Sequence, residues 1–132
     1  MASLARYTRA RSFPLPAAAE SMDAAQIIVI DGDTVALGRQ RIRLQGFDTP
    51  ETFDAKCPAE YAKGVEARER LKELMASGKV DLVFSHRHDR YGREIARLLV
   101  DGEDIAAIMI QEELAVKFPL GHKPDWCHGK VR

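Results

Sequence analysis

The sequence predicts an α+β domain built on a five-stranded antiparallel β-sheet with two to three α-helices. Three observations indicate this class. Short apolar runs separated by turn signals fill the first part of the chain, a long segment with apolar residues at helical spacing follows, and two more strand-like runs precede a second helical segment. Strands and helices grouped in this way, instead of alternating one by one, are typical of α+β domains.

Three strands are expected in the first part, in the apolar runs Ile27 to Ile30, Thr34 to Leu37 and Arg41 to Phe47. Asp31-Gly32 lies between the first two runs. It is a strong hairpin signal, because a type I′ turn requires positive φ at both central residues. Taken alone, this acidic segment indicates a turn more strongly than a metal site.

Alternation along the third strand places Arg43 on the face opposite to Ile42 and Leu44, because successive side chains of a strand point to opposite faces. Arg43 is therefore not expected in the core. One interpretation is a solvated surface arginine. The other is an arginine that binds a phosphate bidentately beside a metal, because acidic residues follow it within a few positions. Spacing alone leaves both interpretations open.

The acidic residues that follow are Asp48-Thr49-Pro50-Glu51. Pro50 disfavours the α conformation at Thr49, so the segment is expected to be extended or turning directly after a strand. Functional residues often lie at such strand ends. Because hard divalent cations prefer oxygen ligands, Asp33, Asp48 and the backbone carbonyl of Thr49 could supply three of them.

A helix is expected from Pro58 onward, ending at Gly78 as a C-terminal cap. Its apolar positions recur at helical spacing and are Ala67, Leu71, Leu74 and Met75. The opposite face is strongly charged. It is expected to be a solvated face with local ion pairs and no further function.

Two more strands are expected at Lys79 to Phe84 and at Ile95 to Val100. A second helix is expected to begin after Asp104, which is a suitable N-cap residue.

Between these two strands, residues 85–93 are expected to form a polar loop. Its arginines and histidines could be no more than a soluble connection. His86 and His88 are interpreted as surface histidines, since no third metal ligand lies near them. Gly92 favours a fixed turn that directs the side chain of Arg93.

The chain contains four motifs, which are Ile30 to Val35, Ile42 to Leu44, Asp48 to Glu51 and Asp89 to Arg93. In this order they resemble the motifs of the staphylococcal nuclease (thermonuclease) family. Four motifs in the right order are far more specific than any one of them. The similarity extends from about Gln26 to Val116. It implies that the sheet closes into a small β-barrel of the OB type, which binds oligonucleotides on one face. The pattern alone leaves an open sheet equally compatible.

The resemblance further implies a nuclease that hydrolyses DNA or RNA with one calcium ion and leaves 3′-phosphate and 5′-hydroxyl ends. Calcium suits a site that offers few protein oxygens and several waters. Negative charge in the transition state would be stabilised by the cation and two guanidinium groups, while a carboxylate orients or deprotonates the attacking water. The residues are the cation ligands Asp33, Asp48 and Thr49, the catalytic residues Arg43, Arg93 and Glu51, and the substrate-binding residues Arg90 and Tyr91.

Asp31 is expected to hold the turn and to tune the cation without binding it directly. The chain also departs from the family pattern. Glu113 stands where a glycine is usual, and no tyrosine follows in the segment where such residues approach the nucleotide. Phe118 could act there as a stacking surface, or equally as a core or interface residue.

Two other functions stay open. A barrel without catalytic activity could bind nucleic acid or another anionic ligand, although the presence of all the acidic and arginine residues speaks against it. A protein-interaction module is the third hypothesis. Its one positive feature is the formal net charge of +0, which is unusual for a binder of polyanions but can hide local patches.

The 132 residues suffice for one domain with its own core, assigned to residues 23–132. Residues 1–22 are expected to be a disordered or loosely packed basic arm, with an atypical export signal as the alternative. No apolar run is long enough to cross a bilayer. The expected partners are DNA or RNA, single strands being favoured, and the expected state is a monomer; the compartment is not fixed.

Cys57 and Cys127 allow three interpretations. A disulfide would tie down the C-terminal segment and imply an oxidising compartment. Two free thiols would suit a reducing cytosol. A zinc site that also uses His122 and His128 lacks the paired short spacings of structural zinc sites and is disfavoured.

Overall fold

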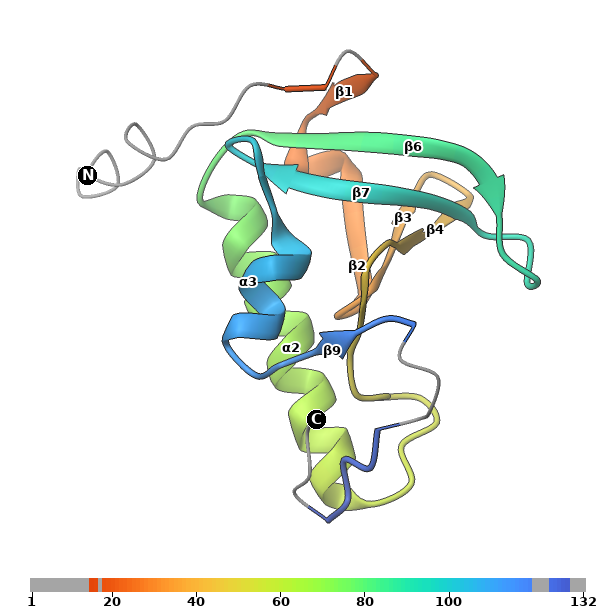
Figure 1. Ribbon diagram of the computed structural model, residues 1–132, viewed down its shortest axis with the longest axis vertical. Helices are drawn as coiled ribbons and strands as arrows, with labels where there is room; N and C mark the ends of the chain where they lie inside the picture. Colours follow the sequence, from red (N-terminus) through yellow and green to blue (C-terminus); the bar gives the residue numbers. More distant parts are fainter. Residues whose placement is uncertain (1–14, 17, 120–123, 129–132) are drawn as a thin grey trace.

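The computed structural model describes residues 15, 16, 18–119 and 124–128 (Figure 1). A curled β-sheet forms one part of the molecule, and two helices lie against it. In chain order the elements are β1 (Ala19–Met22), a 3-10 turn η1 (Ala24–Gln26), β2 (Ile27–Asp31), β3 (Thr34–Leu37), β4 (Gln40–Leu44), β5 (Phe47–Asp48), α2 (Pro58–Ala76), β6 (Val80–His88), β7 (Glu94–Val100), β8 (Glu103–Asp104), α3 (Ile105–Gln111) and β9 (Val116–Lys117).

The sheet confirms the α+β class and an OB-like half-barrel, but its pairing is mixed. Its strand order is β1-β6-β7-β4-β3-β2, with β8 beside β7, and β5 and β9 pair separately. β4 and β7 run parallel, with Arg43 opposite Ile95, so the prediction of a purely antiparallel sheet is wrong. The alternation of a strand indicates which side chains face inward, and it carries no information on the neighbour or its direction.

Strand β1 lies inside the segment predicted to be an N-terminal arm. Ala19 pairs with Val83 and Met22 with Val80, so β1 extends the sheet along β6. Residues 1–14 and 17 of the predicted arm lie outside the described residues.

Helix α2 has the apolar face that its spacing predicts, because Ala67, Leu71, Leu74 and Met75 are all buried. Its end differs from the prediction. The helix stops at Ala76, Ser77 is the cap, and Gly78 does not adopt positive φ. A Cβ atom at Gly78 would collide with the carboxylate of Asp101. The C-terminal cap predicted at Gly78 is instead Ser77, one residue earlier in the chain.

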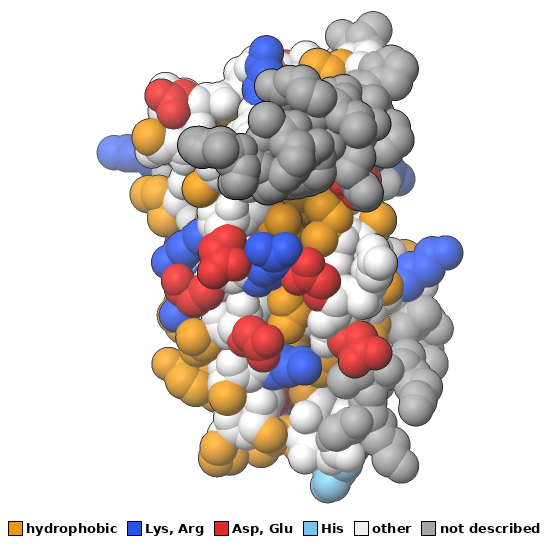
Figure 2. Space-filling view, turned by 90° about the vertical axis from the view of Figure 1, so that its left-hand side faces the viewer, with side chains coloured by type: hydrophobic (Ala, Val, Ile, Leu, Met, Phe, Trp, Pro, Cys, Tyr) orange, Lys and Arg blue, Asp and Glu red, His pale blue; other side chains and the backbone are white. Residues whose placement is uncertain are grey.

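The outer face of α2 carries the predicted ion pairs. Arg70 makes a bidentate contact with Glu112 at 2.7 Å and also reaches Glu73 at 3.2 Å, while Lys72 lies 3.2 Å from Glu69. Figure 2 shows acidic and basic side chains intermingled on the side of the molecule that carries the helices. Exposed pairs of this kind contribute little individually, and the Arg70–Glu112 contact also joins α2 to the end of α3.

Strand β6 is longer than predicted. Ser85 to His88, expected in a polar loop, continue the strand up to a pair between His88 and Glu94. The register shifts between Phe84 and His88, and His86 has a φ of 64° there. This end of β6 carries polar side chains because it extends beyond the core. The alternation of apolar and polar residues that identifies a strand in the sequence is therefore absent there.

The second helix, α3, begins as predicted. Asp104 is its N-cap, and the Asp104 carboxylate accepts a hydrogen bond from the backbone N–H of Ala106 at 2.9 Å. The core lies between the curled sheet and the two helices, and its largest fully buried side chains include Ile42, Leu44, Phe47, Leu71, Leu82, Leu98, Ile105 and Met109. Within the residues described, none of the helices is both long and apolar enough to span a membrane.

Candidate active site

Asp33 and Asp48 come together at one end of the barrel. Asp33 follows β2 in the turn to β3, and Asp48 ends β5. Asp33 is buried, and its two oxygens accept hydrogen bonds from the backbone N–H of Thr49 and from the hydroxyl of Thr34, both at 3.0 Å. The first bond ties the two acidic motifs to each other across the sequence.

The turn that presents Asp33 is not the predicted type I′ turn. Asp31 pairs with Thr34, so that Gly32 and Asp33 are the central residues, and neither has positive φ. A Cβ atom at Gly32 would lie 2.8 Å from Cγ2 of Thr49 and 2.9 Å from Cβ of Ala67. Glycine therefore lets the turn approach α2 and the second acidic motif.

Arg43 points at these acids. Its Nη1 donates to the backbone carbonyls of Leu44 at 2.8 Å and Phe47 at 2.9 Å. Its Nη2 lies 3.5 Å from Asp48 Oδ1 and 3.6 Å from Asp33 Oδ2, and the side chain is only 12% exposed. Arg43 is off the core as predicted, and the interpretation as a solvated surface arginine is wrong.

The pKa of Asp48 reflects how close the acidic side chains lie to one another. Burial raises the pKa of Asp48 to about 6, and the neighbouring charge of Asp33 adds to this; Arg43 opposes the rise, and Glu51 contributes to it. Carboxylates that repel one another in a partly buried site favour the arrival of a further positive charge.

The donor set fits a hard divalent cation. No three His, Cys, Asp or Glu side chains in the described ranges form a metal-binding group on their own. Two carboxylates are nevertheless close enough to share one guanidinium nitrogen, and such cations complete their coordination with backbone carbonyls and water. Thr49 is 2% exposed, and its Oγ1 has no hydrogen-bond partner in the described part of the chain. Thr49 follows Asp48 directly in the sequence, and its backbone N–H donates to Asp33 at 3.0 Å.

Asp31 is held away from this pair by a hydrogen bond that its carboxylate accepts from the hydroxyl of Thr52. Burial raises the pKa of Asp31 above its ordinary value; the bond from Thr52 counteracts the rise, and the charge of Asp33 adds to it. Asp31 thus links the β2–β3 turn to the segment after Glu51. The role expected for Asp31, to tune the cation without binding it, stays a prediction.

Arg93 reaches the acids from the β6–β7 hairpin. Its Nε donates to Asp89 at 2.6 Å, and its Nη1 lies 3.3 Å from the hydroxyl of Thr34, which in turn donates to Asp33. Gly92 has the φ of 82° that a fixed turn needs. Asp89 also accepts from the backbone N–H groups of Tyr91 and Arg93, both at 2.9 Å. The hairpin therefore aims Arg93 toward the acidic pair.

A cleft of about 550 Å³ opens beside the two arginines. The guanidinium groups of Arg90 and Arg93 lie 5.1 and 5.5 Å from the ring centroid of Tyr91, which is 69% exposed. The ring of Phe118 lies 4.9 Å from the Arg43 guanidinium and is also exposed. One wall of the site is therefore basic and aromatic.

A family model described as staphylococcal nuclease homologue matches residues 41–125, well over half of the chain. The chain belongs to this family.

Relatives within it include Endonuclease YncB of Bacillus subtilis (strain 168), 39% identical over 93 residues that cover 65% of this chain and 43% of YncB. The SPbeta prophage-derived endonuclease YokF of the same organism is 38% identical over 93 residues, 65% of this chain and 31% of YokF. Thermonuclease of Staphylococcus hyicus is 35% identical over 94 residues, 67% of this chain and 55% of the thermonuclease. The chain spans between 31% and 55% of the length of these nuclease relatives.

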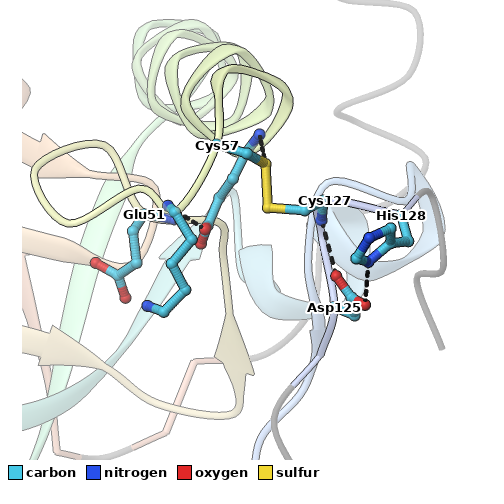
Figure 3. Close-up of a disulfide and its surroundings, with 7 residues drawn as sticks. Glu51, Cys57, Asp125, Cys127 and His128 are labelled. Atoms are coloured by element: carbon cyan, nitrogen blue, oxygen red, sulfur yellow. Dashed lines mark hydrogen bonds and ion pairs between the residues drawn. A yellow bond between two sulfur atoms is a disulfide. The ribbon is translucent and has the colours of Figure 1, made fainter.

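In this staphylococcal nuclease homologue, Glu51 lies on the other wall of the site. It lines a second, smaller cavity of about 250 Å³ together with Asp48, Thr49 and Lys56, and the C-terminal segment 124–127 closes the cavity. The segment is fixed by a disulfide between Cys57 and Cys127, whose Cα atoms are 6.0 Å apart. Figure 3 shows Glu51 and this disulfide in the same part of the molecule.

The disulfide decides among the three interpretations of the cysteines. No free cysteine exists in the described residues, so free thiols and a zinc-thiolate site are both wrong here. His122 lies outside the described residues, and His128 instead contacts Asp125 at 2.6 Å.

Sequence reasoning missed several contributors to the site. The sequence assigns no role to Asp89 and indicates only a strand position for Thr34. It leaves three roles open for Phe118, and the ring contact with Arg43 places this residue in the cleft. β9 positions it, because β9 pairs with β5 and the Phe118 N–H donates to Gly46 at 3.1 Å. The motif DRYGR, in which an acidic residue lies four positions before an arginine, is the sequence signal that could have indicated the contact of Asp89 with Arg93.

Proposed function

We propose that this protein is a calcium-dependent nuclease that hydrolyses phosphodiester bonds of DNA or RNA as a monomer. The observation that supports the proposal best is the convergence of two guanidinium groups on one acidic pair. Arg43 contacts Asp33 and Asp48 directly, and Arg93 approaches Asp33 through the Thr34 hydroxyl. The names of the nuclease relatives support the same reaction class.

Arg43 and Arg93 bind the scissile phosphate. A guanidinium can donate two parallel hydrogen bonds to phosphate oxygens. Because both side chains are fixed by protein hydrogen bonds before substrate arrives, they stabilise the negative charge of the five-coordinate transition state without a large reorganisation.

Glu51 acts on the water. Its carboxylate accepts a proton as the water oxygen forms its bond to phosphorus, and the bond from phosphorus to the 5′-oxygen breaks on the opposite side. The leaving oxygen takes a proton from solvent water to become a 5′-hydroxyl, and the phosphate stays on the 3′ end.

Asp33, Asp48 and the carbonyl of Thr49 would hold calcium beside this phosphate. The bound ion supplies positive charge at the phosphate oxygens and at the attacking water. The shared guanidinium contact and the raised pKa of Asp48 support a cation position here.

The cleft beside Arg43 receives the nucleotide. Tyr91 and Phe118 offer exposed rings on which bases stack, and Arg90 offers a further positive charge. Unpaired bases expose both faces for such stacking, so single strands are the favoured substrate. The Cys57–Cys127 disulfide supports function in an oxidising compartment, such as outside the cell.

The test incubates the purified, oxidised protein with single-stranded DNA and calcium, with and without chelator. Chelator-sensitive cleavage that yields 3′-phosphate ends supports the proposal. Binding without cleavage at every calcium concentration would instead indicate a non-catalytic nucleic-acid-binding barrel. Neither binding nor cleavage of DNA or RNA would contradict both functions.

A further inference from the structure

One face of α2 supports the loop that carries Glu51. Glu60 and Gly64 lie one helical turn apart on this face and both are buried. A Cβ atom at Gly64 would lie 2.8 Å from the carbonyl oxygen of Glu51 and 2.9 Å from that of Pro50. The backbone of the helix therefore packs directly against the backbone of the loop.

Glu60 holds the same loop at two points. One oxygen of its carboxylate accepts from the backbone N–H of Glu51 at 3.1 Å, and the other accepts from the backbone N–H of Lys56 at 2.9 Å. The residue is only 5% exposed. One buried carboxylate thus spans the loop 51–56, which has no regular secondary structure of its own.

The chemistry of this contact requires a carboxylate. Each oxygen faces an N–H donor, so an amide side chain would turn an NH₂ group toward one of the two donors and lose that hydrogen bond. A buried donor left without an acceptor is costly, and the loop would move to avoid it. Such a movement would start at Glu51 itself.

We propose that Glu60 is a positioning residue for the reaction: by binding the amides of Glu51 and Lys56, it fixes the Glu51 carboxylate beside Asp48, where it acts on the water. The proposal rests on the proposed nuclease function. Gly64 completes the same support, because a side chain there would displace the loop. Glu60 lines the same cavity as Glu51, and both of its oxygens are engaged by the two amides, so it acts on the reaction through Glu51.

The test compares Glu60→Gln with Glu66→Gln, an exposed position on the same helix with the same change of charge. Glu60→Gln is expected to lower kcat about 10- to 100-fold, as small misplacements of catalytic groups do. KM for single-stranded DNA and the affinity for calcium stay unchanged, because the arginines and the three calcium-binding residues, Asp33, Asp48 and Thr49, lie outside the loop 51–56. Amide exchange at Glu51 and Lys56 becomes faster. Glu66→Gln behaves like the native protein.

A second variant covers the case in which Glu60→Gln does not fold. Gly64→Ala raises the helix propensity of α2, so a fall in its kcat with KM unchanged supports the proposal. Native kcat in folded Glu60→Gln, or in Gly64→Ala if Glu60→Gln is unfolded, overturns it while the nuclease function stands. If the native protein does not cleave, the proposed function fails, and the positioning role fails with it.

Discussion

The two walls of the candidate site are held in place by different means. The basic wall is built on regular strands and a tight hairpin, and Arg43 and Arg93 are fixed by contacts within a few residues of their own positions. The acidic wall ends in the irregular loop after Asp48. Distant groups hold that loop, namely Glu60 of α2 and the disulfide to the C-terminal segment.

The two walls are therefore expected to respond differently to substitution. A strand-borne side chain keeps its place as long as the sheet is folded, so a substitution there removes one chemical group. A loop held by a few distant contacts can shift while the rest of the protein stays folded. Changes on the basic wall should therefore affect the chemistry most, and changes on the acidic wall should affect position and stability as well.

The largest effect is expected from Arg43→Ala. Removing one preorganised donor to a transition-state oxygen typically lowers kcat about 10²- to 10³-fold, and Arg43 also neutralises Asp33 and Asp48. The measurement is steady-state cleavage of single-stranded DNA with saturating calcium. Arg41→Ala is the matched control, because Arg41 is an exposed arginine of the same strand. Native turnover in Arg43→Ala would remove this residue from the mechanism.

The next effect is expected from reducing the disulfide. Opening the bond between Cys57 and Cys127 is expected to lower the free energy of unfolding by about 2–4 kcal/mol. Guanidinium unfolding with and without a phosphine reductant measures it.

The free energy of unfolding of the double variant Cys57→Ser, Cys127→Ser should equal that of the reduced protein and should not change when the reductant is added. Since the bond supports only the acidic wall, binding of single-stranded DNA in chelator should survive reduction. A reduced protein as stable as the oxidised one would show that the crosslink contributes nothing to the fold.

The last effect concerns pH and is of the same order as that of the disulfide. The pKa of Asp48 is raised from 3.8 to about 6, so the folded protein binds a proton there that the unfolded chain releases. The stability linked to this proton is present in full below about pH 4 and is lost as the pH rises through 6. At about 1.4 kcal/mol for each unit of pKa difference, the full change is about 3 kcal/mol.

Denaturant unfolding in chelator between pH 4 and 7 measures this change. Because other groups also titrate in that range, the comparison is with Asp48→Asn, whose free energy of unfolding should rise relative to the native protein as the pH increases. Parallel pH profiles for the two proteins would contradict the assignment of this proton to Asp48.

The strand-borne part of the site could be predicted from the sequence. Alternation put Arg43 off the core, and the motifs around Asp33, Asp48 and Arg93 are short, local and tied to strand ends, so their spacing survives folding. The class of the fold followed from the same patterns. Parallel pairing of β4 with β7 did not, because it depends on where distant segments meet.

The supports of the loop could not be predicted. In the sequence, Glu60 cannot be distinguished from the other acidic residues of a charged helix. Only its burial against two backbone amides sets it apart. The sequence predicts that Gly32 is needed for positive φ. It is needed for space instead, which a sequence cannot show because the atoms of Thr49 and Ala67 that would collide come from remote positions.

The bond between Cys57 and Cys127 makes a covalent ring of the chain segment that includes α2, β6, β7 and α3, over a sequence separation of 70. A protease that cuts once within this ring, for example in the exposed hairpin around Tyr91, would leave both fragments joined. Such a nicked molecule would keep its pieces together through an unfolding event and could reassemble without diffusion of one part to the other.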